Sequence, residues 1–126
     1  DLENKDLDER AEKLKQQDIA IGIISNGNKA QQVKKLEKVG IYKFIKDELF
    51  IVSEEVGFAK PDPNIFLFAQ AKAKVKPTQI LFVGDNPIID IEPSQKLGWK
   101  SVLIDYFTKY PEEKSIKSLK DISSEP

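Results

Sequence analysis

Four short apolar runs, separated by segments with helical periodicity, constrain the fold of this 126-residue chain more than any other feature. The runs cover residues 19–24, 49–52, 80–83 and 101–104. Nearly continuous apolar runs of this length are typical of strands that are buried on both faces of a parallel sheet. Strands that alternate with helices in this way indicate parallel βα units. The sequence therefore predicts a three-layer α/β fold with a parallel sheet.

Start and stop signals place two helices in the first part of the chain. Asp6 is suited to cap a first helix, with Glu9 three residues later as its capping-box partner. A second helix is predicted over residues 29–39, where Gly40 provides the stop. The helical spacing of apolar residues predicts which side chains face the core. They are Leu7, Ala11, Leu14, Val33 and Leu36.

Two further helices are predicted in the second part of the chain. The third begins at Asp62-Pro63, because aspartate is a good cap and proline suits the first helical position. Its buried side is predicted to carry Ile65, Phe66 and Ala69. The fourth covers residues 88–97, and Gly98 ends it. The polar segment from Tyr106 onward is predicted to hold one more short docking element, formed by Ile116, Leu119 and Ile122.

Composition excludes several classes of function. The net charge is −1 and no apolar run approaches the roughly 20 residues of a membrane span, so nothing favours a nucleic acid or a membrane as partner. Without histidine or cysteine, an imidazole base, a thiolate and a disulfide are impossible within this chain. The lack of cysteine and of a secretory leader fits a cytoplasmic protein. The chain also contains no methionine, which leaves open where the natural protein begins.

Polar residues follow the first predicted strand. In open parallel α/β sheets, ligands bind outside the carboxyl ends of the strands. Ser25-Asn26-Gly27 directly follows the run 19–24. A hydroxyl and backbone N–H groups at a strand-to-helix turn can hold an anion, aided by the positive end of the next helix. The alternative is a helix cap with a turn glycine.

Lys60 is the second candidate, within Gly57-Phe58-Ala59-Lys60-Pro61-Asp62-Pro63. The neighbouring prolines restrict the backbone around this lysine. Its ammonium group could neutralise a phosphate or a cluster of carboxylates. The alternative is an ordinary surface lysine, since the chain has 20 lysine and arginine residues in all.

Asp85 and Asp90 are the third candidate, in Gly84-Asp85-Asn86-Pro87-Ile88-Ile89-Asp90 after the run 80–83. Two carboxylates at this spacing, with Asp85 at the strand tip, suit a hard cation such as Mg²⁺. The alternative is a turn aspartate followed by a first-turn aspartate that favours the helix dipole.

The order and spacing of the three clusters are more specific than any one of them. From about Leu7 to Ile104 the chain resembles the haloacid-dehalogenase-like superfamily in its second, third and fourth motifs. The resemblance implies a Rossmann-like core and Mg²⁺ as cofactor. It also implies roles for individual residues: Ser25 and Asn26 bind the transferring phosphoryl group, Lys60 stabilises charge on nucleophile and phosphate, Asp85 ligates Mg²⁺, and Asp90 ligates or orients the metal and its waters.

The family's first motif, an apolar strand ending in Asp-x-Asp, is not recognisable in the chain. Asp6-Leu7-Asp8 is rejected as this motif, because no buried strand precedes it and its helix-capping role already accounts for it. In the family, the missing strand lies between the strands that correspond to 19–24 and 80–83. Three explanations are open: the chain is part of a longer protein, another chain supplies the strand, or this is a shortened inactive relative.

Residues 1–126 are therefore expected to form a partial core domain without the first-motif strand and cap. It would comprise a leading helix (about 1–18), a motif-bearing core (19–104) and a C-terminal tail (105–126). The resemblance implies that the intact protein is a Mg²⁺-dependent phosphatase of a small phosphorylated metabolite, acting through an aspartyl-phosphate whose aspartate lies outside this chain. The alternatives are a 2-haloacid dehalogenase, a phosphate-transferring mutase and a non-catalytic binding domain. The sequence allows a homo-oligomer without specifying one.

Overall fold

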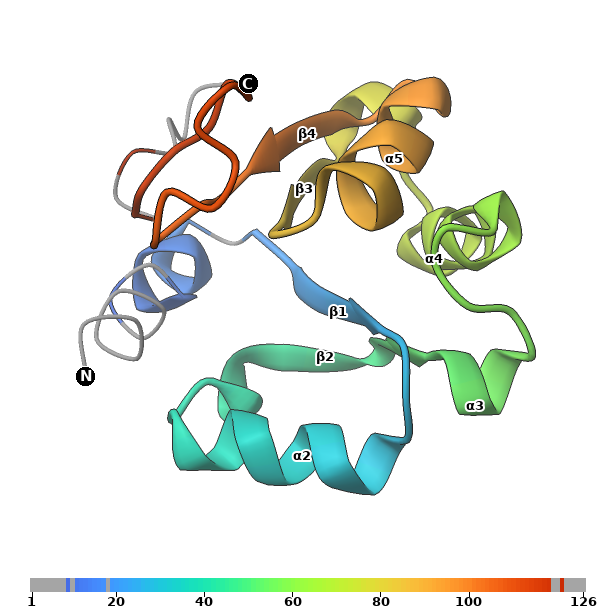
Figure 1. Ribbon diagram of the computed structural model, residues 1–126. Helices are drawn as coiled ribbons and strands as arrows, with labels where there is room; N and C mark the ends of the chain where they lie inside the picture. The colour runs from blue at the N-terminus through green and yellow to red at the C-terminus, as the bar shows by residue number, and fades with distance from the viewer. Residues whose placement is uncertain (1–8, 10, 18, 119–120, 122–126) are drawn as a thin grey trace.

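The computed structural model describes residues 9, 11–17, 19–118 and 121, and four strands form two parallel pairs within them (Figure 1). Strand β1 (Ile21–Ser25) pairs with β2 (Ile45–Val52), and β3 (Leu81–Gly84) pairs with β4 (Lys100–Leu103). The two pairs are separate sheets, so within the described part of the chain neither β1 nor β3 has a second strand partner. In Figure 1, β1 and β3 are the inner strands and β2 and β4 the outer ones.

Helices and tight turns connect the strands. Residues 11–16 are helical and precede β1. Helix α2 (Lys29–Lys38) and a 3₁₀ turn (Tyr42–Phe44) join β1 to β2. Helices α3 (Ser53–Val56) and α4 (Pro63–Ala73) and a second 3₁₀ turn (Pro77–Gln79) lead to β3. A π-helical turn (Pro87–Ile91) and α5 (Glu92–Lys96) join β3 to β4.

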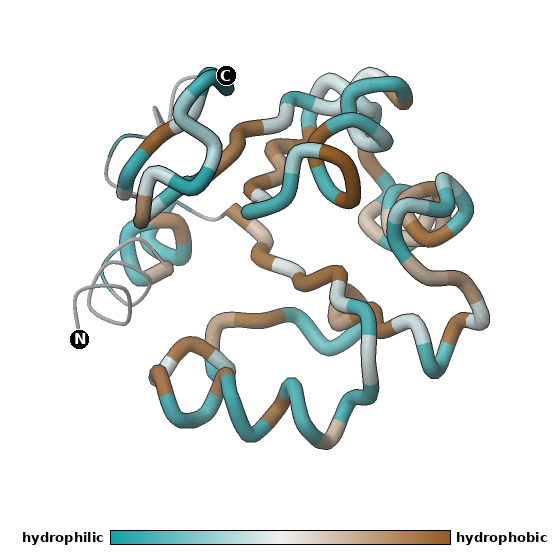
Figure 2. The backbone as a smooth tube through the Cα atoms, in the orientation of Figure 1, coloured by the Kyte–Doolittle hydropathy of each residue, from teal (hydrophilic) through white to brown (hydrophobic). Residues whose placement is uncertain are grey.

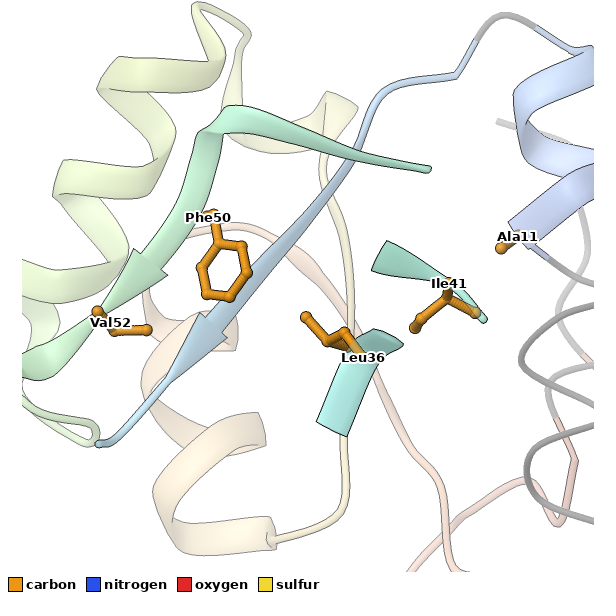
Figure 3. Close-up of a cluster of buried hydrophobic side chains, with 5 residues drawn as sticks. All are labelled: Ala11, Leu36, Ile41, Phe50 and Val52. Carbon is orange, nitrogen blue, oxygen red and sulfur yellow. The ribbon is translucent and has the colours of Figure 1, made fainter. Parts of the chain in front are cut away.

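Alternate residues of β2 face two different cores, which gives the predicted three layers. Phe50 and Val52 pack with Leu36 of α2, together with Ala11 and Ile41 (Figure 3). Ile51 points to the opposite face, as the two-residue period of a strand requires. It packs against a second buried cluster formed by Ile65, Phe66, Ala69 and Trp99. The predicted inward residues Leu36, Ile65, Phe66 and Ala69 are all buried, as expected.

The β1–β2 pairing contains an irregularity that Gly22 makes possible. Ile21 pairs with Ile45 but Ile23 pairs with Phe50, so extra residues of β2 bulge out between them. The bulged segment is hydrophilic in Figure 2. A Cβ atom on Gly22 would lie 2.7 Å from Leu49 Cβ and 2.8 Å from Leu49 O. Only a residue without a side chain allows this close approach of the two backbones.

The strands are less buried than the sequence predicted. No residue of β1 is fully buried, and Leu81 at the start of β3 is 45% exposed. The apolar runs predicted strands buried on both faces, and each described inner strand has a strand partner along one edge only. The missing coverage lies between the two sheets, where the sequence-based argument placed the family's first-motif strand.

The predicted fourth helix divides into two elements. Its first turn is the wide turn Pro87–Ile91, and the α-helix begins only at Glu92. Pro93 lacks an N–H group and cannot continue the regular helical hydrogen bonds, which accounts for the change of winding. Among the other expected helices, α2 and α4 begin within a residue of the predicted positions. The predicted cap Asp6 and the rejected Asp6-Leu7-Asp8 lie outside the described residues.

Asp105 anchors the segment that follows β4. This buried carboxylate accepts hydrogen bonds from the backbone N–H groups of Lys109 (2.7 Å) and Tyr110 (2.8 Å), and Lys117 Nζ lies 3.7 Å away. Ile116, one of the residues predicted to form a short docking element, forms a parallel bridge with Ile104. Leu119 and Ile122 lie outside the described residues. No helix in the described ranges is long and apolar enough to cross a membrane.

Candidate active site

Lys60 joins the carboxyl ends of the two sheets. Its ammonium Nζ donates a 2.6 Å hydrogen bond to Asp90 Oδ1, in the turn after β3. Its backbone N–H donates to Asn26 Oδ1 (2.7 Å), and Asn26 Nδ2 donates to the Lys60 carbonyl (3.0 Å). Asn26 follows β1, so residues from both strand ends and from the loop between α3 and α4 meet at Lys60. Three of the predicted site residues are therefore in direct contact.

The Lys60–Asp90 ion pair is largely withdrawn from solvent. The side chains of Lys60 and Asp90 are 14% and 5% exposed, and the Lys60 ammonium lies 5.9 Å from the centre of the Phe82 ring. Breaking such a pair by removing one partner costs about 3–5 kcal/mol, because the remaining charge is left buried without compensation. Lys60 is therefore a fixed and oriented positive charge, unlike the ordinary surface lysine that was the alternative.

Asp90 is held by the turn in which it lies. Its Oδ2 atom accepts a 3.2 Å hydrogen bond from Asn86 N–H. Asn86 Oδ1 in turn accepts from Ile88 and Ile89 N–H (2.9 and 3.0 Å) and so caps the turn. Gly84 leaves the space that Asp90 fills, since a Cβ atom there would lie 2.7 Å from Asp90 Cγ. Both carboxylate oxygens of Asp90 thus have protein donors.

Ser25 and Gly27 occupy the turn between β1 and α2. Ser25 is half-buried, and its hydroxyl donates only a long 3.4 Å contact to Asn26 O. Gly27 N–H donates to Ser53 Oγ (2.8 Å), so this N–H group is already satisfied by the protein. The helix cap is Asn28, whose Oδ1 accepts from Gln31 N–H at 2.9 Å. The Ser25 hydroxyl therefore has no short hydrogen bond within the described residues.

Asp85 stands at the tip of β3 in a different environment from Asp90. Its side chain is exposed, and none of the described residues forms a hydrogen bond or ion pair with it. No group of three or more acidic or other metal-ligating side chains occurs in the described part of the chain. Among the two aspartates of this turn, Asp85 is therefore the uncommitted carboxylate, because Asp90 is bound to Lys60 and Asn86.

The sequence-based reasoning missed two residues that shape the site. Asn86 caps the turn that carries Asp90, and an asparagine directly before Pro87 is a helix-start signal that could have revealed it. Ser53 binds Gly27 across the β1–β2 pair, at 26 positions' separation. No local signal distinguishes Ser53 from other serines, because its partner is set by the pairing of the strands.

Sequence comparison agrees with this geometry. Residues 3–104 match the family model described as haloacid dehalogenase-like hydrolase. The chain is 33% identical over 91 residues to a glyceraldehyde 3-phosphate phosphatase of Methanopyrus kandleri, with 72% of this chain and 38% of that protein covered. It is also 33% identical over 87 residues to a phosphoserine phosphatase of Thermus thermophilus, with 69% of this chain and 34% of that protein covered.

A solved structure shares the fold. The putative hydrolase YfnB of Bacillus subtilis, bound to magnesium, superposes with a TM-score of 0.77 at 28% identity, and 89% of this chain and 50% of that one are covered. This chain thus spans only about a third to two fifths of the two curated relatives. The family match covers most of the chain and includes all three polar clusters. The chain belongs to the haloacid dehalogenase-like hydrolase family.

Proposed function

We propose that this chain is the charge-stabilising part of a Mg²⁺-dependent phosphatase that acts, as the intact protein, on a small phosphorylated metabolite. The observation that carries the proposal is that Lys60 is held at the carboxyl ends of the strands, its backbone by Asn26 and its ammonium by Asp90. A phosphate ester resists attack because its anionic oxygens repel a nucleophile. A preorganised cation lowers this barrier where negative charge develops. Both curated relatives described above are named as phosphatases.

The chain's own residues would divide the work. Ser25, with a hydroxyl that has no strong protein partner, would donate a hydrogen bond to the phosphoryl group. Asn26 would hold the Lys60 backbone in place through its two hydrogen bonds. Lys60 would stabilise charge on the nucleophile and on the transferring group. Asp90 would orient Lys60, a more specific role than the metal-orienting one expected from the sequence.

The residues present are compatible with Mg²⁺. This ion usually keeps several waters and is bound by one or two carboxylates together with substrate phosphate oxygens. The exposed, uncommitted Asp85 carboxylate fits that requirement, and Asp90 is close in sequence but engaged with Lys60. Bound Mg²⁺ would supply positive charge that offsets the repulsion between phosphate oxygens and nucleophile. The remaining ligands would come from water, from substrate and from a carboxylate outside this chain.

The nucleophile is proposed to be an aspartate on a strand that lies between β1 and β3 in the intact protein. Both inner strands have a partner on one side only among the described residues. An unpaired buried backbone group costs about 1–3 kcal/mol, so a strand bonded to both edges would stabilise the fold considerably. Its carboxyl end would stand beside Lys60. Residues 1–126 would then be a partial core domain, and the strand and cap would complete it.

The test is to assay the intact protein with para-nitrophenyl phosphate, with Mg²⁺ and after its removal by a chelator. We expect turnover that needs Mg²⁺ and is lost in a Lys60→Met variant that remains folded. Release of halide from 2-haloacids without phosphatase activity would instead identify a dehalogenase. Phosphate binding without turnover of any phosphate ester would identify a non-catalytic binding domain.

A further inference from the structure

Two hydroxyls, one fully buried (Ser94) and one partly buried (Ser101), lie next to the turn that carries Asp90. Ser94 of α5 is fully buried, and its Oγ lies 2.8 Å from Asp90 O and 3.1 Å from Ile91 O. The same oxygen lies 2.5 Å from Ser101 Oγ on β4. These contacts link β4, α5 and the π-helical turn. Among the described residues, neither serine forms a hydrogen bond with Lys60.

The direction of these hydrogen bonds follows from the chemistry of the groups. Each hydroxyl has one hydrogen to donate and can accept others. The carbonyl oxygens of Asp90 and Ile91 can only accept, so the Ser94 hydrogen points toward them. Ser101 must then supply the hydrogen between the two hydroxyls. The chain of donors therefore runs from Ser101 to Ser94 to the Asp90 carbonyl, and each bond polarises the next.

The backbone of Asp90 needs such support because its turn is irregular. Asn86 O accepts from both Asp90 N–H (3.0 Å) and Ile91 N–H (3.3 Å), which marks a turn wider than an α-helix. Wide turns of this kind are uncommon and often occur at functional sites. The Ser94 hydroxyl bonds to the carbonyl of the same residue whose carboxylate binds Lys60. The Ser94 hydroxyl thus holds the backbone of the wide turn, and with it the direction of the Asp90 side chain.

We propose that Ser94 and Ser101 are positioning residues, which act through the Asp90 backbone to place the Lys60 ammonium for phosphoryl transfer. The proposal rests on the function proposed above and adds two residues to it. The simpler explanation is an ordinary hydrogen-bonded pair that contributes only to stability. The two explanations differ in what happens when both hydroxyls are removed together.

The experiment compares Ser94→Ala with the double variant Ser94→Ala/Ser101→Ala in the intact protein. Ser94→Ala leaves the Ser101 hydroxyl without its acceptor and should lower the denaturation midpoint. The double variant has no stranded hydroxyl, so its midpoint should move back toward that of the wild type. Its Asp90 carbonyl still lacks the Ser94 hydrogen. Thr78→Ala is the matched control, since Thr78 is exposed and precedes the amino end of β3.

With para-nitrophenyl phosphate, we expect kcat to fall about 10-fold in both the single and the double variant, with KM within about 3-fold of wild type. Thr78→Ala should keep the wild-type kcat. Recovery of kcat together with the midpoint in the double variant would show that the pair is structural only. If the double variant does not fold, the single variants Ser101→Ala and Ser101→Thr test the proposal instead. Ser101→Thr keeps the hydroxyl and should retain the wild-type kcat, whereas Ser101→Ala should have a lower kcat. Equal kcat values for these two would overturn the proposal.

A crystallographic measurement separates this proposal from the proposed function. In the Ser94→Ala and Ser101→Ala variants, the Lys60 Nζ to Asp90 Oδ1 distance should lengthen from 2.6 Å to beyond hydrogen-bonding range. An unchanged distance in both overturns the positioning role, whatever the activity. If the intact wild-type protein hydrolyses no phosphate ester, the proposed function fails, but the distance still shows whether the serines position Lys60.

Discussion

Lys60 Nζ lies 2.6 Å from Asp90 Oδ1, and this contact joins two segments that are 30 positions apart in the chain. It places a buried positive charge at the carboxyl edge of both strand pairs without contact with the exposed Asp85 carboxylate. Two aspartates that the sequence presented as one cluster thus have different surroundings: Asp90 is paired with the lysine, whereas Asp85 is exposed.

Replacing Lys60 with methionine should destabilise the protein and abolish phosphatase activity. The aliphatic stem is kept, but Asp90 loses the partner of its buried charge, which should lower the free energy of unfolding by about 3–5 kcal/mol. Urea denaturation measures this change. Lys96→Met is the control, because Lys96 forms an exposed pair with Glu92 and should cost less than about 1 kcal/mol. Equal effects of the two changes would contradict the special status of Lys60.

Gly84→Ala should displace Asp90 and weaken its bond with Lys60. The new methyl group would lie 2.7 Å from Asp90 Cγ, and overpacking of this kind costs about 1–3 kcal/mol. Thermal denaturation and a crystal structure of the variant would measure the cost and the displacement. Gly57→Ala is the comparison, since it adds the same methyl group where a Cβ meets nothing within 4 Å, and its cost would reflect the positive φ of 84° and no overpacking. If Gly84→Ala changes neither the stability of the protein nor the position of Asp90, then Asp90 does not need a glycine at position 84.

Asp85→Asn should weaken Mg²⁺ binding by the intact protein more than any other single aspartate change at the surface. The substitution removes negative charge from a candidate ligand while its size is kept. Isothermal titration with Mg²⁺ gives the affinity directly. Asp47→Asn is the matched control, because Asp47 is exposed and lies in β2 away from the Asp85 turn. Asp90→Asn is expected to have a smaller effect on affinity but a larger one on kcat, since Asp90 acts through Lys60.

The stability of the protein should fall in acid partly because of Asp105. Burial alone would raise the pKa of this carboxyl group, but the N–H groups of Tyr110 and Lys109 and the charge of Lys117 outweigh it and hold the pKa below its ordinary value of 3.8. A carboxyl group with a lowered folded pKa stabilises the protein above the unfolded value, and this contribution disappears as the pH falls through the folded value. Unfolding free energies measured between pH 6 and pH 2 should therefore decline less steeply in Asp105→Asn. An identical decline in both proteins would show that Asp105 does not contribute.

The 126-residue chain alone should hydrolyse no phosphate ester above background. Phosphoryl transfer through a covalent intermediate needs a nucleophile in line with the leaving oxygen. The chain has no histidine or cysteine, and Lys60 and Asp90 are engaged with each other. The assay uses para-nitrophenyl phosphate and Mg²⁺, with the intact protein as positive control. Mg²⁺-dependent turnover by the short chain that Asp6→Asn or Asp8→Asn abolishes would identify Asp6-Leu7-Asp8 as the first motif.

Local pattern was enough to predict most of the elements. The apolar run at 80–83 and the cap Asp62 with Pro63 each reflect interactions within a few residues, so the sequence shows them directly. Asp62 indeed caps α4, accepting a hydrogen bond from Asn64 N–H. The family resemblance then supplied what pattern alone left open, namely that the polar clusters belong to one site.

Contacts that depend on how the strands are paired could not be predicted. The double hydrogen bond between Asn26 and the Lys60 backbone spans 34 positions, and nothing in either segment marks the partner. The sequence assigned Asn26 to the phosphate site without showing that its amide also holds the Lys60 loop, and its role toward phosphate stays a prediction. The wide turn at Asp90 was also missed, although Pro93, which cannot donate a helical hydrogen bond, is a local signal of irregular winding.

The two faces of β2 have a consequence for how the molecule comes apart. Phe50 and Val52 belong to one apolar cluster and Ile51 belongs to the other. Three successive residues of one strand thus contribute to both clusters. Unfolding of β2 would expose both clusters to solvent at once. Neither cluster can therefore unfold without removing contacts from the other. The strand thus makes the two clusters unfold as one cooperative unit. The fluorescence of Trp99, the chain's single tryptophan, should therefore follow the unfolding of both clusters, although Trp99 belongs to only one of them.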